Sequence, residues 1–121
     1  PATEYVARFI GFENFLEFER IKTNTYRAAD GCTFEVDMDC QEERYAGTIR
    51  PDDIRLAEDG QTGNVIQGTV GVRTFLGKSY QYEVNTAAGL IKVNMETSHV
   101  FGEGETVRLY LPKDKLVLVR R

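Results

Sequence analysis

The sequence predicts a mainly β domain, built as a small barrel or sandwich of short antiparallel strands with one short helix at its N-terminus. Apolar and polar residues alternate in five separate runs, glycine-containing turns separate these runs, and helical spacing is found only at residues 2–10. Many short strands joined by tight turns, without a second helix, are typical of small barrels and sandwiches.

The N-terminal helix is expected at residues 2–10, and Gly11 follows as a stop signal. The apolar side chains that recur at helical spacing are Tyr5, Val6, Phe9 and Ile10. A helix this short is not stable alone in water. We therefore expect its apolar face to dock on another surface.

Each strand is expected where apolar side chains occupy every second position, because one face of such a strand is buried and the other is wet. The five alternating runs are residues 16–19, 33–39, 80–84, 91–95 and 106–111. A short strand is expected around residues 54–56. Glycines between Gly68 and Val72 lie within a further strand, which predicts a bend or bulge. We group the strands as 12–56 and 64–119, and strands can cross between the groups.

Composition narrows the class of protein. The 121 residues fit one domain, or one domain plus an arm, and a chain of this length needs no disulfide or metal to fold. A net charge of −4 argues against nucleic-acid binding, which requires a basic surface. Cys32 and Cys40 are predicted to be reduced thiols of a cytosolic protein rather than a bridge. The first residue is Pro1, which favours a fragment of a longer chain over a processed one.

One segment imitates a phosphate-binding loop. Leu76-Gly77-Lys78-Ser79 has the end of that motif, but position 72 is valine where the motif needs glycine. A strand pattern follows it, whereas phosphate binding requires the N-terminus of a helix. We therefore predict a hairpin turn at Gly77 and Lys78, and no nucleotide site.

The remaining polar residues do not form a recognisable catalytic or metal-binding set. The acidic cluster of Asp37, Asp39, Glu42 and Glu43 departs from the calcium-loop pattern, so solvated carboxylates are expected. The sole histidine, His99, has no evident catalytic partner in sequence. No catalytic, cofactor-binding or metal-binding residue is predicted.

Three stretches of the chain together resemble one family. Residues 1–14 are similar to the P-x-x-x-[FY]-V-A-x-F-[IL]-G-x-x-N segment that ends the nucleotide-binding domain of importer ATPases of the polyamine, iron and sugar type. Residues 48–54 resemble the family's [IV]-R-P-E-[DH]-[IL], with Asp52 in place of glutamate. Residues 68–84 resemble G-x-V-x-x-x-x-[FY]-L-G-x-x-x-x-Y-x-V, and residues 105–116 resemble its close. In this order, the stretches resemble the C-terminal transport-associated OB-like (TOBE) domain of ABC-importer ATP-binding subunits.

The resemblance implies a division of the chain into a linker helix from a missing ATPase domain, at residues 1–11, and an OB-like β domain at residues 12–121. It implies an accessory domain that supports subunit dimerisation and the regulation of solute import, without catalysis. The helix would dock, through Tyr5, Val6, Phe9 and Ile10, on the ATPase domain or on a partner copy. The motif residues expected to be structural are Arg50, Pro51, Asp52, Gly68 and Gly77.

The same resemblance implies partners and a location. The partners are the chain's own N-terminal ATPase domain, a second ATPase subunit and permease subunits in the membrane, and no nucleic acid is expected. ATP and magnesium belong to the missing ATPase domain alone. The assembly would lie in the cytoplasm, peripheral on the inner face of the cell membrane. The transported solute is not predicted.

Two other functions compete with this one. Related barrels in molybdate-binding proteins bind oxyanions, and Thr97, Ser98 and Lys115 occupy polar positions of the closing segment, so an oxyanion or small-ligand site is the alternative. A nucleic-acid module would need exposed aromatic side chains beside a basic groove. Tyr80 and Tyr82 are aromatic, but we expect them to face the core.

Overall fold

The computed structural model describes residues 14–37 and 44–120. The helix expected at residues 2–10, with its proposed docking side chains, lies outside the described residues, and so does Cys40. Within the described ranges the chain is almost entirely strands and turns, which confirms the predicted mainly β class.

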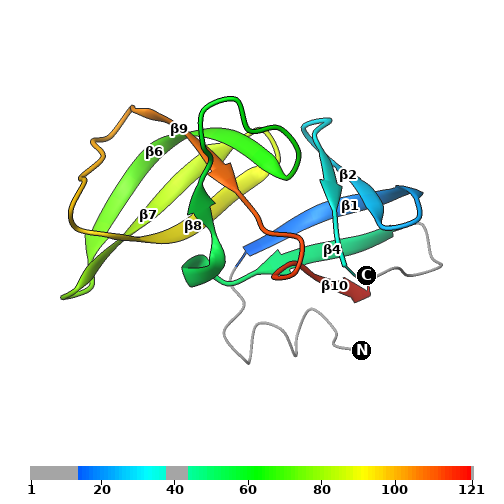
Figure 1. Ribbon diagram of the computed structural model, residues 1–121. Coiled ribbons are helices and arrows are strands. Elements are labelled where there is room, and N and C mark those ends of the chain that lie inside the picture. The colour runs from blue at the N-terminus through cyan, green and yellow to red at the C-terminus, as the bar shows by residue number, and fades with distance from the viewer. Residues whose placement is uncertain (1–13, 38–43, 121) are drawn as a thin grey trace.

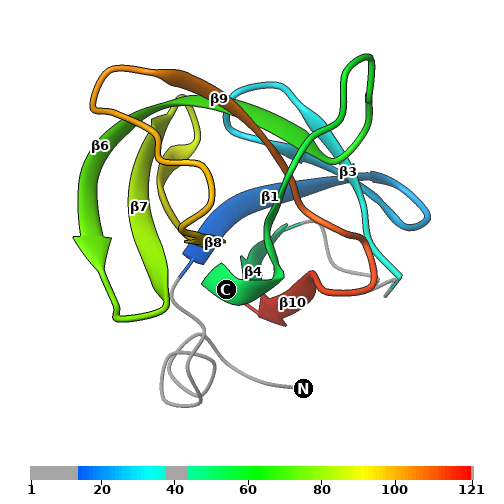
Figure 2. The ribbon, with the colours of Figure 1, turned by 60° about the vertical axis from the view of Figure 1, so that its left-hand side comes forward.

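Two five-stranded antiparallel sheets face one another (Figure 1). The first sheet has the order β10-β4-β1-β2-β3 and consists of β1 (Asn14–Lys22), β2 (Thr25–Ala28), β3 (Thr33–Glu35), β4 (Arg44–Ile49) and β10 (Val117–Arg120). The second has the order β5-β9-β6-β7-β8 and consists of β5 (Arg55–Leu56), β6 (Val65–Phe75), β7 (Ser79–Thr86), β8 (Gly89–Glu96) and β9 (Thr106–Tyr110). Figure 2 shows the second sheet curling around toward β1.

The two sheets exchange one strand each. Strands β1 to β4 form the first sheet and β6 to β9 form the second, but β5 pairs with β9 and β10 pairs with β4. Residues 55–56, from the expected group 12–56, therefore belong to the second sheet. Residues 117–120, at the end of the expected group 64–119, belong to the first sheet. The last strand, β10, therefore returns to the first sheet, beside β4.

The core lies between the sheets and follows the alternation of the sequence. In β7 and β8, for example, Tyr82, Val84, Ile91 and Val93 point inward and are fully buried, while the residues between them are less buried. Strand β4 is different, because every residue from Tyr45 to Ile49 is buried. A strand covered on both faces shows no alternation, which explains why the sequence pattern did not reveal β4.

The bulge expected between Gly68 and Val72 is present in β6. Pairing with β7 runs from Gly68 to Val70 and resumes at Arg73, with a register shift between them. The backbone of β7 approaches Gly68 so closely that a Cβ atom there would lie 2.6 Å from the carbonyl oxygen of Asn85. A side chain at this position would push β6 and β7 apart.

Two buried asparagines link the two sheets through side-chain hydrogen bonds to backbone groups. The Asn14 amide donates to the carbonyl oxygens of Ile49 (3.2 Å) and Lys92 (2.8 Å), and its oxygen accepts from the Lys92 N–H (2.7 Å). Asn14 thus joins β1 and β4 of the first sheet to β8 of the second. Buried backbone groups need such partners, since an unpaired one costs about 1–3 kcal/mol.

Asn64 makes the corresponding link at another corner of the fold. Its amide donates to the carbonyl oxygens of Glu35 and Leu111, both at 2.8 Å, and its oxygen accepts from the Glu35 N–H at 2.7 Å. The residue has a φ of 57°, a left-handed conformation that asparagine tolerates better than most residues. It therefore connects β3 to the segment that follows β9.

Candidate functional site

The motif Arg50-Pro51-Asp52 lies where the chain passes from the first sheet to the second. Pro51 opens the 3₁₀ turn η1 (Pro51–Asp53), in which the Asp53 N–H donates to the Arg50 carbonyl oxygen at 3.0 Å. Proline suits this first position because its missing N–H is not needed there. The turn packs on β8, where the Asn94 amide donates to Asp52 Oδ1 at 2.8 Å.

A groove with a cavity volume of about 360 Å³ runs between this turn and the end of β8. One wall comes from the η1–β5 segment and the other from β8 and the loop after it. The lining residues are Asp52, Ile54, Arg55, Leu56, Asn94, Met95, Glu96, Ser98, His99 and Phe101. The lining mixes two carboxylates with one guanidinium, one imidazole and four apolar side chains. This mixture offers no concentration of positive charge for an anion.

The residues of the alternative ligand site are divided by the structure. Ser98 lines the groove together with the motif residue Asp52, and the neighbouring Thr97 is exposed. Lys115 belongs to the turn between β9 and β10, where its N–H donates to the Pro112 carbonyl oxygen at 3.0 Å. Figures 1 and 2 both show the loop after β8 apart from that turn. The structure therefore does not bring Lys115 to the two hydroxyl groups.

A row of aromatic rings leads from this groove to the turn between β6 and β7. Successive ring centroids are 4.5 to 6.1 Å apart in the order His99, Phe101, Tyr82, Tyr80 and Phe75. The Phe101 N–H donates to the hydroxyl of Tyr82, which is fully buried, so Tyr82 faces the core as expected. The row is buried at its middle, at Tyr82, and exposed at both ends, because His99 is exposed and Phe75 is 60% exposed.

The end of the β6–β7 hairpin is an exposed apolar surface. Val72, Phe75 and Leu76 are all at least half exposed, and we call them the hairpin tip. The guanidinium of Arg73 lies 5.1 Å from the Tyr80 ring centroid and donates a hydrogen bond to the Phe101 carbonyl oxygen, so it links the hairpin to the loop after β8. Figures 1 and 2 show this turn projecting away from the first sheet. Exposed apolar side chains of this size are available for contact with another surface.

The segment that imitates a phosphate-binding loop forms the turn of this hairpin. The Leu76 N–H donates to the Ser79 carbonyl oxygen at 2.8 Å, and Gly77 has a φ of +97°, which glycine adopts without strain. Strand β7 begins at Ser79, where a phosphate site would need a helix. The predicted hairpin turn is confirmed.

Comparison with known proteins identifies the family. Residues 47–119, more than half of the chain, match the TOBE domain family. The chain belongs to the TOBE domain family. The match begins inside β4 and includes Arg50, Pro51, Asp52, Gly68 and Gly77.

Two curated relatives of this TOBE domain are import proteins. The chain is 32% identical over 94% of its length to the spermidine/putrescine import ATP-binding protein PotA 1 of Pseudomonas aeruginosa, and covers 33% of that protein. It is 30% identical over 98% of its length to the PotA protein of Thermobifida fusca, and covers 34% of it. The chain thus spans about a third of the length of the curated relatives it matches.

The fold of the TOBE domain is also that of a solved structure. The cytoplasmic molybdate-binding protein ModG, in a form with molybdate bound, superimposes with a TM-score of 0.73 over 90% of this chain and 96% of that one. Because the two sequences are only 9% identical, the likeness concerns the fold alone. It confirms the expected OB-like β architecture.

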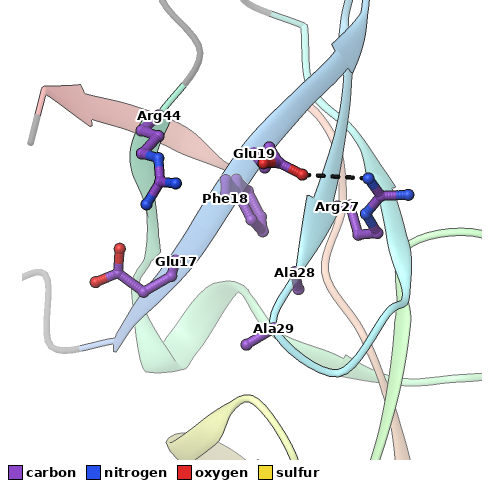
Figure 3. A pocket seen from close by; sticks show the side chains of 7 residues that line it. All are labelled: Glu17, Phe18, Glu19, Arg27, Ala28, Ala29 and Arg44. Carbon is purple, nitrogen blue, oxygen red and sulfur yellow. Dashed lines mark hydrogen bonds and ion pairs between the residues drawn. The ribbon is translucent and has the colours of Figure 1, made fainter.

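A second, smaller pocket of the TOBE domain lies on the first sheet (Figure 3). It has a cavity volume of about 220 Å³ and is lined by Glu17, Phe18, Glu19, Arg27, Ala28, Ala29 and Arg44. Arg27 donates to Glu19 at 3.2 Å, and both side chains are about half exposed. An exposed ion pair of this kind contributes little to stability. The open pocket shows no convergence of groups that would bind a specific ligand.

The described residues contain one cysteine, Cys32, which is a free thiol. Burial is the main cause that raises the pKa of Cys32, and the hydrogen bond and negative charge of Asp30 raise it further. Within residues 14–37 and 44–120, no group of three or more His, Cys, Asp or Glu could hold a metal ion. No helix in those ranges is long and apolar enough to cross a membrane.

Sequence reasoning missed most of the groove. Asn94, Met95, Glu96 and Phe101 were not singled out as site residues, because each belongs to a strand pattern or a loop and carries no local motif. These residues are brought together because the turn with the Arg-Pro-Asp motif packs on β8, a strand far along the chain. The sequence carries no signal for that contact.

Proposed function

We propose that this TOBE domain is the accessory barrel of an ABC-importer ATP-binding subunit, without catalytic activity of its own. The family match carries the proposal, together with two relatives that are ATP-binding proteins of spermidine/putrescine import. The chain aligns with about a third of each relative, which fits a domain of a larger subunit. ATP and magnesium would be bound by the ATPase domain of that subunit.

The described residues support an accessory role. The segment nearest to a nucleotide motif is a hairpin turn whose backbone is engaged by Leu76 and Ser79. The fold offers instead a two-sheet body with an exposed apolar hairpin tip. We propose that the tip contacts the second ATP-binding subunit and so supports dimerisation. Permease subunits would hold the pair at the inner face of the cell membrane, in the cytoplasm.

The native polypeptide tests this proposal directly. An antibody raised against the 121-residue chain would be used to recover the protein from cells that express its gene, and the recovered protein would be photolabelled with an azido analogue of ATP. We expect a polypeptide about three times as long as this chain, labelled by the analogue and chased by ATP. A recovered polypeptide that carries the chain but takes no label would contradict the proposal.

Oxyanion or small-ligand binding is the second candidate, supported by the fold shared with ModG and by the position of Ser98 in the groove. The carboxylates of Asp52 and Glu96 in the same groove disfavour an anion, and Lys115 lies in another loop. Titration calorimetry with molybdate and sulfate decides between the candidates. Saturable heat that Ser98→Ala removes would favour this second function, and no heat at millimolar ligand would eliminate it.

A further inference from the structure

Part of the first sheet is buried on the side that faces away from the core. Ala46 and Val119 pair across β4 and β10, are 1% and 0% exposed, and form a cluster separate from the main core. Leu118, the neighbour of Val119, points to the opposite face and belongs to the core, because side chains alternate along a strand. Phe15 of β1 packs against the cluster. We call Phe15, Ala46, Thr48, Val117 and Val119 the outer face.

The outer face is buried at Thr48 as well as at Ala46 and Val119, although Glu17, which pairs with Ala46 on its β1 side, is exposed. Thr48 pairs with both Phe15 and Val117, and it is completely buried. Its Oγ1 atom has no hydrogen-bond partner in the part of the chain that the structure describes. A hydroxyl at an open sheet surface would bind water. Something must therefore cover this face, and among the described residues the apolar group packed on the Ala46–Val119 pair is Phe15 alone.

Only three stretches of the chain lie outside the described residues, and two of them fit poorly. Residues 38–43 contain one aspartate and two glutamates and join the arginine end of β4, whereas Thr48 is near the other end of that strand. The last stretch is Arg121 alone, a single charged residue. Covering an apolar face with such charges would desolvate them at a large cost.

We propose that residues 2–10 dock on the outer face through Tyr5, Val6, Phe9 and Ile10. These side chains supply an apolar stripe that would cover the face. A helix over this segment would be too short to be stable without such a contact. Strand β1 begins at Asn14 and its next residue, Phe15, belongs to the face. The four steps from Ile10 to Asn14 span at most about 14 Å, so the segment is tethered at the border of the surface that it covers.

The consequence is that the chain entering the domain is anchored to it, independently of the proposed function. In the subunit proposed above, a domain preceding residue 2 would be joined to the barrel through a packed contact along β4 and β10. A packed contact fixes orientation, whereas a free linker would not.

Tryptophan fluorescence tests the docking, since the chain contains no tryptophan. In Phe9→Trp we expect emission at shorter wavelength than free tryptophan, and quenching by acrylamide reduced several-fold. Glu4→Trp is the matched control, because at helical spacing it lies on the side away from the apolar stripe. Equal quenching in the two variants would overturn the proposal. Protection that appears only as the protein associates into dimers would also overturn it, by assigning the face to a second copy.

A double-mutant comparison gives a second readout that does not depend on a new tryptophan. Phe9→Ala and Val119→Ala should each lower the melting temperature, and the double variant should lose less than the sum of the two shifts. Phe9→Ala combined with Val72→Ala, on the exposed hairpin tip, should be additive. Thr48→Val should raise the melting temperature by a few degrees, because it removes an unpaired hydroxyl from a buried site. Additive losses with Val119→Ala would overturn the proposal even if both variants fold.

Discussion

Strand β4 and the hairpin tip are opposite extremes of the same domain. Every residue from Tyr45 to Ile49 is buried, with the core on one side and the outer face on the other. At the hairpin tip, Phe75 and Leu76 are 60% and 50% exposed. From this difference we expect substitutions in β4 to act on folding and substitutions at the tip to act on association.

The largest effect is expected at Gly47, in the middle of β4. A Cβ atom at this position would overlap the ring of Phe18, and that ring is itself stacked on Tyr26 and Phe34. Gly47→Ala should therefore lower the free energy of unfolding by about 3 kcal/mol, the upper range for overpacking. Urea denaturation followed by circular dichroism measures it.

A matched glycine limits the interpretation of that result. At Gly102, an added Cβ would be 3.6 Å from the Glu105 carboxylate, an ordinary contact. Gly102→Ala should change the free energy of unfolding by less than about 0.5 kcal/mol. Equal losses at the two positions would show that β4 is no more tightly enclosed than an exposed loop.

The next effect concerns the link between the sheets. Asn14→Ala removes three hydrogen bonds and leaves the Lys92 N–H and the Ile49 carbonyl oxygen without their partner. We expect a loss of about 2–3 kcal/mol in the free energy of unfolding. Hydrogen exchange should also show earlier opening of β8 than of β7, since Asn14 contacts β8.

Asn94→Ala is the control for this prediction. Its side chain donates to Asp52 and accepts from Gln81, and both contacts are at least partly open to solvent, so water can replace them. The expected loss is about 0.5 kcal/mol. If Asn14→Ala cost no more than this, the two sheets would be held by apolar packing alone.

At the hairpin tip we expect an effect on association and almost none on stability. Phe75→Asp with Leu76→Asp should change the free energy of unfolding by less than about 0.5 kcal/mol per site, because both side chains are exposed. In the full ATP-binding subunit, the dissociation constant of the subunit pair should rise about tenfold or more. Sedimentation equilibrium measures that constant. Leu90→Asp, also exposed but at the far end of β8, should leave it unchanged.

These extremes also mark the limits of prediction from sequence. Strands β7, β8 and β9 were predictable because each has one buried and one wet face, and so was the bulge that follows Gly68. Strand β4 was not, since burial on both faces removes the alternation. The groove was equally hidden, because Asp52 and Ser98 come from distant segments. Asn14 closed a family motif, but its partner on β8 is a backbone, which leaves no pattern in side chains.

The smallest effect is expected at Cys32, which is intermediate between the two extremes in burial. Burial first, and then Asp30, raise the pKa of this thiol above its ordinary value. The thiolate is the reactive form, so alkylation of Cys32 by iodoacetamide should be slower than that of a free cysteine at the same pH. Asp30→Asn removes the negative charge, and the rate profile for Cys32 should then move to lower pH. Peptide mass spectrometry distinguishes Cys32 from Cys40. An unchanged profile in Asp30→Asn would assign the slow reaction to burial alone.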